Sequence, residues 1–232
     1  MPRLPRSHES HGMTSKYAAL IIFDVDGTLF RTELVTVPAV QRTFANHGLP
    51  IPDHETIQAF FGKPVEDYEA WLAQQCPPDE AAQIVEETNA HELTLIASEG
   101  QLYPGVHEML TCLLEMRCCL TVCSNGPSPY VNEFVRTHGL QSHLTLVRAR
   151  DAGGKNKTAM VADIMNEIPV RPAAVVGDRR EDIAAARANG ALAIAARYGF
   201  APEEEHAGAD ASIDRISDLP DIIQAAWPQV FR

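Results

Sequence analysis

The sequence lacks any apolar run near the roughly 20 residues that span a bilayer, and its first residues lack the apolar core of a signal peptide. Basic residues are scarce as well. The chain has 19 lysines and arginines against 31 aspartates and glutamates, which gives a formal net charge of -12. Nucleic acids and anionic membrane surfaces are bound by basic patches, so we expect neither nucleic acid nor membrane as a partner. An anionic small molecule remains a suitable ligand where a local cation attracts it.

The sequence also lacks the paired CxxC motifs of a structural zinc site, and its nine histidines have no metal-ligand spacing. The five cysteines are Cys76, Cys112, Cys118, Cys119 and Cys123. Most of them fall in apolar stretches, where a free thiol behaves as a small buried hydrophobe. Free thiols are typical of a reducing compartment, so we expect a cytoplasmic protein.

Short apolar runs recur along the chain, and most are followed by a helical pattern. The first run, residues 18–23, reads Ala-Ala-Leu-Ile-Ile-Phe without interruption, which is typical of a strand buried on both faces of a parallel sheet. The further runs are residues 118–123, 144–147, 173–176, 192–195 and, more weakly, 211–213. Strands that alternate with helices predict an α/β fold with a doubly wound, mostly parallel, Rossmann-like sheet.

One long segment breaks this alternation, because residues 34–100 contain only helical patterns. The patterns begin near Thr36, Asp53, Pro64 and Pro78, and the second of them ends at Gly62. A crossover between parallel strands needs only about a dozen residues, so the segment is too long for one. We therefore expect an all-helical cap subdomain at 34–100, inserted into an α/β core made of residues 17–33 and 101–232. Residues 1–16 are expected to form a flexible N-terminal tail.

Polar side chains follow the expected strands at their carboxyl ends, the edge at which open α/β sheets bind ligands. They are Asp24 and Asp26 after the first strand, Ser124 and Asn125 after the second, Lys155 and Lys157 beyond the third, and Asp178 and Asp182 after the fourth. Carboxylates, a hydroxyl and an ammonium are therefore expected at one edge of the sheet. Asp178 is also expected to N-cap the helix that follows it.

This set of groups fits phosphoryl transfer with a metal ion. Asp24 and Asp26 leave the strand on the same side, so Asp24 can be a nucleophile and Asp26 its proton-transfer partner. Mg²⁺ prefers one or two carboxylates with phosphate and water, and Asp24, Asp178 and the Asp26 backbone carbonyl would supply the protein ligands. Ser124 and backbone N–H groups near Asn125 would bind phosphate oxygens, and a lysine would balance the negative charge. The alternative is that Asp24 and Asp26 only form a turn at the end of the strand, because Asp-Gly is common in turns.

Four segments then resemble the motifs of the haloacid dehalogenase superfamily. Residues 23–29, Phe-Asp-Val-Asp-Gly-Thr-Leu, are similar to its first motif, and residues 122–126, Val-Cys-Ser-Asn-Gly, to its second. Lys157 stands at its third motif, and residues 175–182 resemble its fourth. The resemblance covers about residues 17–226, and the helical segment matches the cap that the family inserts between the first two motifs. It points to the phosphoglycolate phosphatase-like or β-phosphoglucomutase-like branch.

The resemblance implies an Mg²⁺-dependent phosphomonoester hydrolase that forms an aspartyl-phosphate on Asp24. Dehalogenases of the family lack an acid at the position of Asp26, so Asp26 points to phosphatases or phosphomutases. It would protonate the leaving alkoxide and then activate water, which requires a protonated Asp26 at the first step. The implied substrate-binding residues are Thr28, Ser124, Asn125, Gly126, Lys63 and Arg31. The implied metal-binding residues are Asp24, Asp26, Asp178 and Asp182.

Several assignments stay open at this point. The third motif usually reads Lys-Pro, but here residues 155–158 read Lys-Asn-Lys-Thr, and we favour Lys157 because it begins a helix. Asp182 either holds a metal-bound water or faces solvent. Arg31 replaces a frequent family aspartate and either contacts substrate or lies on the surface. Lys63 lies in a segment similar to the family's substrate-specificity turn, and either binds a substrate carboxylate or second phosphate or is simply exposed.

Three functions are compatible with these residues. The leading hypothesis is a phosphatase of a small phosphorylated metabolite, phosphoglycolate-like or a sugar phosphate. A β-phosphoglucomutase-like phosphomutase is the alternative that shares Asp26. A non-catalytic binding protein on the same fold is the third, because a fold alone does not settle a function. The intact set of Asp24, Asp26, Lys157 and Asp178 argues against it. Nothing in the sequence fixes the oligomeric state.

Overall fold

The computed structural model describes residues 16–151 and 153–231 of the chain. The tail predicted at residues 1–16 lies outside the described residues apart from Lys16. In the described part, six parallel strands form one sheet in the order β3-β2-β1-β4-β5-β6. The strands are β1 (Ala19–Phe23), β2 (Cys118–Cys123), β3 (Leu146–Arg148), β4 (Ala173–Gly177), β5 (Leu192–Ala196) and β6 (Ala211–Ile213). The predicted doubly wound, Rossmann-like α/β fold is confirmed.

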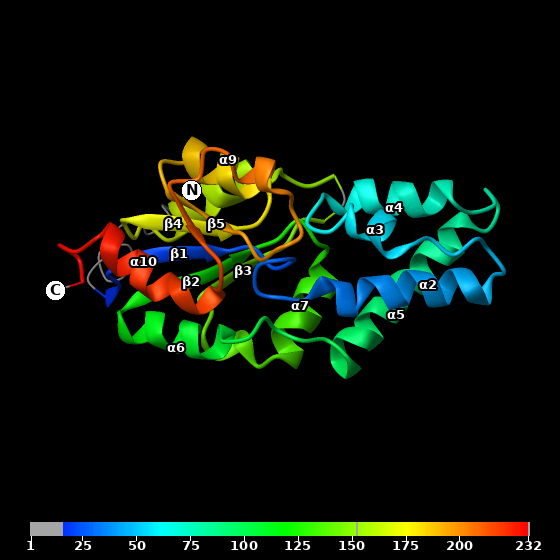
Figure 1. The fold of residues 1–232 in the computed structure, drawn as a ribbon, viewed down its shortest axis with the longest axis horizontal. Coiled ribbons are helices and arrows are strands. Elements are labelled where there is room, and N and C mark those ends of the chain that lie inside the picture. The colour runs from blue at the N-terminus through cyan, green and yellow to red at the C-terminus, as the bar shows by residue number, and fades with distance from the viewer. Residues whose placement is uncertain (1–15, 152, 232) are drawn as a thin grey trace, which may run out of the picture.

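Helices cover both faces of this sheet (Figure 1). One face packs against α6 (Val106–Glu115), α7 (Ser128–Thr137) and α10 (Leu219–Ala226), and the other against α8 (Lys157–Glu167) and α9 (Arg180–Ala188). Successive side chains of a strand point to opposite faces. Ile21 and Phe23 of β1 accordingly lie in the first apolar cluster, and Leu20 and Ile22 in the second. The unbroken apolar run of β1 is thus explained by burial on both faces.

The segment between β1 and β2 is helical and extends from the end of the sheet (Figure 1). Its helices are α2 (Thr36–Asn46), α3 (His54–Gln58), α4 (Val65–Gln74) and α5 (Ala81–Ser98). They enclose an apolar cluster of their own, with Phe44, Ile57 and Leu72 fully buried. In addition, α5 packs along α7 of the sheet layer. The cap boundaries at 34 and 100 stay a prediction.

Two of the helix ends expected here were wrong. The side chain of Asp53 does cap α3 by accepting the N–H of Thr56 at 2.8 Å, but α3 ends at Gln58 rather than at Gly62. The residues between them form turns, and Gly62 has the left-handed φ of +73° that favours glycine. The helix expected to open at Pro78 begins at Ala81, because residues 78–80 form a turn.

The five cysteines are all free thiols in the described part of the chain. Cys118, Cys119 and Cys123 of β2 are buried, whereas Cys76 and Cys112 are partly exposed. None of the described helices combines the length and the apolar character that crossing a bilayer requires. The cytoplasmic location stays a prediction.

Candidate active site

The site begins where β1 ends, at Asp24, whose N–H donates to the carbonyl of Val176 in β4 at 2.9 Å. Gly27 then turns the chain with a left-handed φ of +75°. A Cβ atom at residue 27 would lie 2.5 Å from Oδ2 of Asp178, closer than real Cβ atoms approach. Only glycine therefore lets this loop pass so close to the acid that follows β4.

Lys157, the first residue of α8, reaches into the same place. Its Nζ lies 2.5 Å from Oδ1 of Asp24 and 2.7 Å from Oδ1 of Asp182, and its side chain is almost fully buried. Asn156 fixes the start of α8, because its side chain accepts the N–H of Ala159 at 2.9 Å. Lys155 instead is exposed and pairs with Asp163 at 2.6 Å. Of the two lysines, the structure brings Lys157 to the carboxylates.

Two further acids come from the segment after β4. Oδ2 of Asp178 accepts the N–H groups of Phe200 at 2.7 Å and Ala201 at 3.1 Å. Asp182 lies in the first turn of α9, where its Oδ2 accepts the N–H of Arg179 at 3.1 Å. The expectation that Asp178 is the N-cap was wrong. Arg179 is the N-cap, because Asp178 is held by the 200–201 loop and Asp182 satisfies the N–H at the helix start.

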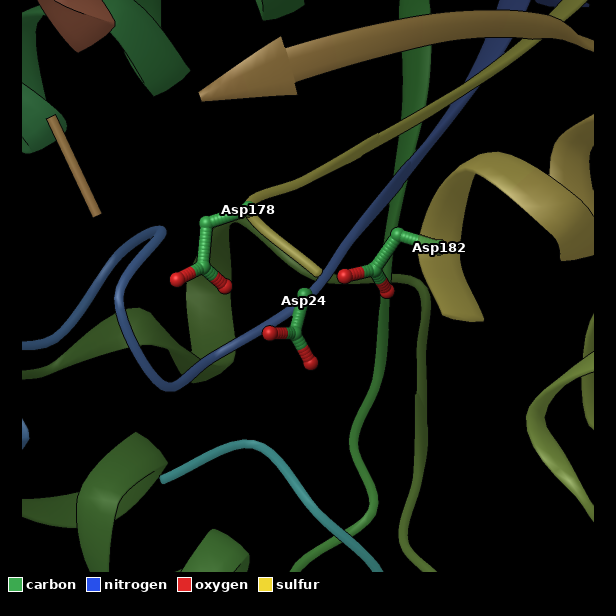
Figure 2. A group of neighbouring side chains, drawn as sticks. All are labelled: Asp24, Asp178 and Asp182. Atoms are coloured by element: carbon green, nitrogen blue, oxygen red, sulfur yellow. The ribbon is translucent and has the colours of Figure 1, made fainter. Parts of the chain in front are cut away.

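The three buried acids offer a site for a cation (Figure 2). Asp24, Asp178 and Asp182 each present one carboxylate oxygen, and these oxygens lie within 4.8 Å of one another. Oδ2 of Asp24 and Oδ1 of Asp178 are buried and have no hydrogen-bond partner among the described residues. Lys157 touches two of the acids but has no ion pair with Asp178 in the described part. An oxygen-only set of this kind fits a hard divalent cation.

Burial shapes the electrostatics of this cluster. It raises the pKa of Asp24, with Lys157 acting against the rise, and it raises the pKa of Asp178 well above its ordinary value. Burial also raises the pKa of Asp182 to about 7. The three acids gather more negative charge than one lysine balances, and each ionised carboxylate opposes the ionisation of the next. A bound divalent cation would remove this imbalance.

Asp26 lies beside the cluster in a different setting. Its Oδ1 accepts hydrogen bonds from the hydroxyls of Thr32 at 2.7 Å and Tyr130 at 2.8 Å. Burial raises the pKa of Asp26, while these two hydrogen bonds act in the opposite direction. The side chain is thus oriented by two donors. Sequence reasoning missed both donors; the available signal was a tyrosine in the first turn of the helix that follows the second motif.

The predicted phosphate-binding residues lie at the end of β2, next to β1. Ser124 is fully buried, and its Oγ accepts the N–H of Gly126 at 3.0 Å. The amide of Asn125 donates to the carbonyl of Gly62 at 2.9 Å, so it joins the sheet layer to the helical segment. Thr28 is buried, and its Oγ1 has no hydrogen-bond partner among the described residues. These positions are brought to one edge of the sheet, together with Asp24.

A cavity of about 60 Å³ lies between this edge and the helical segment. Its lining includes Asp26, Gly126 and Tyr130 on one side and Lys63, Tyr68 and Glu92 on the other. Lys63 is thus brought to the site, with its Nζ 4.9 Å from the centre of the Phe60 ring. Arg31 is not, because it pairs with Glu33 at 2.9 Å and does not line the cavity. Sequence reasoning missed Tyr68 and Glu92.

The fold and the buried carboxylates define an α/β protein with an acidic site at the carboxyl edge of a parallel sheet. Residues 21–196 match the haloacid dehalogenase-like hydrolase family, and the chain belongs to that family. The predicted family is therefore confirmed.

The curated relatives include phosphatases that span almost the whole chain. A phosphoglycolate phosphatase of Cupriavidus necator is 28% identical over 215 residues, covering 89% of this chain and 93% of the relative. A phosphoglycolate phosphatase of Chromobacterium violaceum is 27% identical and covers 91% and 99%. A 5'-nucleotidase of Pseudomonas aeruginosa is 25% identical and covers 80% and 85%. The prediction of a phosphatase of this family is confirmed.

Solved structures show the same fold. A predicted phosphoglycolate phosphatase from Haemophilus somnus superposes with a TM-score of 0.80 at 21% identity, covering 90% of this chain and 99% of its own. CbbY from Rhodobacter sphaeroides in complex with phosphate superposes with a TM-score of 0.72 at 24% identity, covering 86% and 95%.

Proposed function

We propose that this protein is an Mg²⁺-dependent phosphomonoester hydrolase that acts on a small phosphorylated metabolite through an aspartyl-phosphate on Asp24. The observation that carries the proposal is the Asp24 carboxylate, held 2.5 Å from Lys157 within a cluster of buried acids. Asp26, two residues along the chain, lines the adjacent cavity. The phosphoglycolate phosphatases among the relatives support a phosphoglycolate-like substrate, and a sugar phosphate is the second substrate class that we propose.

The first step is attack of Asp24 on the phosphorus atom. The bond between phosphorus and the ester oxygen breaks, and Asp26 gives its proton to the leaving alkoxide. In the second step Asp26, now a carboxylate, takes a proton from the water that attacks the phosphorus of phospho-Asp24. Inorganic phosphate leaves, and both aspartates return to their starting states. Thr32 and Tyr130 keep the Asp26 carboxyl in one orientation through both steps.

The surrounding residues position the phosphate and balance charge. Ser124, Thr28 and the N–H groups near Asn125 and Gly126 are proposed to bind phosphate oxygens. Lys157 neutralises charge beside the nucleophile and is itself held by Asp182. Mg²⁺, held by the Asp24 and Asp178 carboxylates and the Asp26 carbonyl, would supply stabilisation of the charge on the transferring phosphoryl group.

Removal of divalent cations is expected to abolish activity. The cluster places buried acids around one oxygen-lined space, and without a cation the phosphate would meet these carboxylates directly. The test measures phosphate release from a panel of phosphomonoesters with Mg²⁺, then with EDTA, then with Mg²⁺ added back. Full activity in EDTA would contradict the metal requirement. Interconversion of sugar phosphates without phosphate release would instead identify a phosphomutase.

Lys63→Ala is expected to raise KM roughly tenfold for the best substrate of this panel, the scale of a hydrogen bond to a charged group. The reason is that Lys63 lines the cavity on the leaving-group side, where its ammonium can bind an oxygen of the substrate. The KM for p-nitrophenyl phosphate should change less. Lys155→Ala is the matched control, because Lys155 is exposed and away from the cavity. An equal rise for both substrates would remove Lys63 from the specificity site.

A further inference from the structure

A buried glutamate in the helical segment faces the same cavity as Asp26. Glu92 of α5 is only 7% exposed, and it lines the cavity opposite the catalytic edge. The hydroxyl of Tyr68 donates to its Oε1 at 3.1 Å, and Thr36 lines the cavity beside it. No ion pair to Glu92 is present in the described part of the chain. The carboxylate is therefore oriented by the Tyr68 hydroxyl and has no cation as an ion-pair partner among the described residues.

Packing alone does not explain an acidic residue at position 92. The inward stripe of α5 runs through Ile84, Thr88, Glu92 and Ile96, one residue for each turn. An apolar side chain would continue this stripe, whereas a buried carboxyl group is costly to keep. Burial raises the pKa of Glu92 to about 7, which expresses that cost. A buried carboxyl group that is kept at this cost and lines a cavity is best explained by a ligand.

The cavity sets both the size and the chemistry of that ligand. At about 60 Å³ the cavity is suited to a leaving group with few non-hydrogen atoms. A carboxylate that entered beside Glu92 would meet a second acid. A hydroxyl or an ammonium would instead donate a hydrogen bond to Glu92, and Lys63 is left to bind a neighbouring oxygen.

We infer that Glu92, oriented by Tyr68, is a subsite for a hydrogen-bond donor on the leaving group. The substrate is then a small phosphorylated polyol or amino alcohol, and a leaving group that ends in a carboxylate is disfavoured. This inference rests on the proposed function and chooses between its two substrate classes: it keeps the sugar phosphates and removes phosphoglycolate.

The test compares kcat/KM for four substrates in the full-length protein with Mg²⁺. Glycerol 3-phosphate carries hydroxyl donors, phosphoethanolamine an ammonium, phosphoglycolate a carboxylate, and p-nitrophenyl phosphate has no donor in its leaving group. The wild type should favour one of the two donor substrates over phosphoglycolate by about tenfold or more, the scale of one hydrogen bond to a charged group. Which of the two donor substrates reacts faster shows whether the subsite prefers a hydroxyl or an ammonium.

Glu92→Gln should lower that preference about tenfold, and Tyr68→Phe should lower it less. Gln keeps the shape of the side chain and removes the cost of a buried charge, so the variant is expected to fold; its melting temperature checks this. Glu86→Gln is the matched control, because Glu86 lies on the same helix and is exposed. A wild type that favours phosphoglycolate, or a Glu92→Gln variant that slows all four substrates equally, overturns the inference and leaves the phosphatase intact. If the protein hydrolyses none of the four substrates, the proposed function itself is overturned.

Discussion

Asp24→Asn is expected to lower kcat for phosphate release roughly 10³-fold or more, because an amide cannot replace the carboxylate nucleophile. The protein should nevertheless stay folded. Lys157 keeps its contact with Asp182 at 2.7 Å, so it is not left as an unpaired buried charge. Asparagine has the shape of aspartate and removes one of the crowded carboxylates whose ionisation burial opposes. The measurement is steady-state phosphate release, with circular dichroism and thermal unfolding to check the fold.

Asp79→Asn is the matched control for this variant. Asp79 is exposed in the turn before α5, and the same chemical change there should leave kcat unaltered. Normal phosphatase activity in Asp24→Asn would contradict an aspartyl-phosphate on this residue. An unfolded Asp24→Asn variant would show instead that the carboxylate is needed for stability, and mass spectrometry for a phosphorylated Asp24 in the wild type would then decide the chemistry.

The central strands β1, β2 and β4 could be predicted from the sequence because they are buried on both faces. Burial of that kind leaves an almost continuous apolar run, and the run at residues 118–123 matches β2 residue for residue. Helix ends were less predictable. At Gln58 the chain leaves the helix for turns that end at Gly62, whose carbonyl accepts a hydrogen bond from the amide of Asn125 at 2.9 Å. Such a contact joins parts of the chain that no local pattern connects.

Some residues of the candidate site could likewise be predicted from the sequence, and others could not. Asp24, Lys157 and Asp178 stand at strand or helix ends, where topology brings side chains together, and their positions could therefore be predicted. Glu92 and Tyr130 lie within helices, and only the packing of α5 against α7 decides what they face. A glutamate in a helical pattern is normally expected at the surface. The N-cap of α9 was predicted at Asp178, but it is Arg179, because the loop at 200–201 holds Asp178 away from the helix start.

Asp26→Asn is expected to lower kcat by about 10²–10⁴, the usual contribution of a general acid–base. Its effect should depend on the leaving group, which distinguishes it from Asp24→Asn. An alkoxide leaves poorly without a proton, so alkyl phosphates should be slowed at the first step. p-Nitrophenolate leaves without help, so attack by Asp24 should continue and phospho-Asp24 should accumulate before slow hydrolysis. Rapid-mixing experiments with p-nitrophenyl phosphate should then show a burst of one equivalent per active site.

The Tyr130→Phe variant tests whether Tyr130 only orients Asp26, the group that transfers the proton. The variant keeps the Asp26 carboxyl but removes one of the two hydroxyls that donate to its Oδ1, leaving Thr32 at 2.7 Å. It should therefore lower kcat much less than Asp26→Asn does and should show no burst. The Asp26 backbone carbonyl is unchanged in both variants, so the Mg²⁺ concentration for half-maximal activity should stay near that of the wild type.

An Asp26→Asn variant that turns over alkyl phosphates at the wild-type rate would assign the proton transfer to another group. A large shift in Mg²⁺ requirement with no burst would instead mean that the Asp26 side chain acts on the metal rather than on the leaving group.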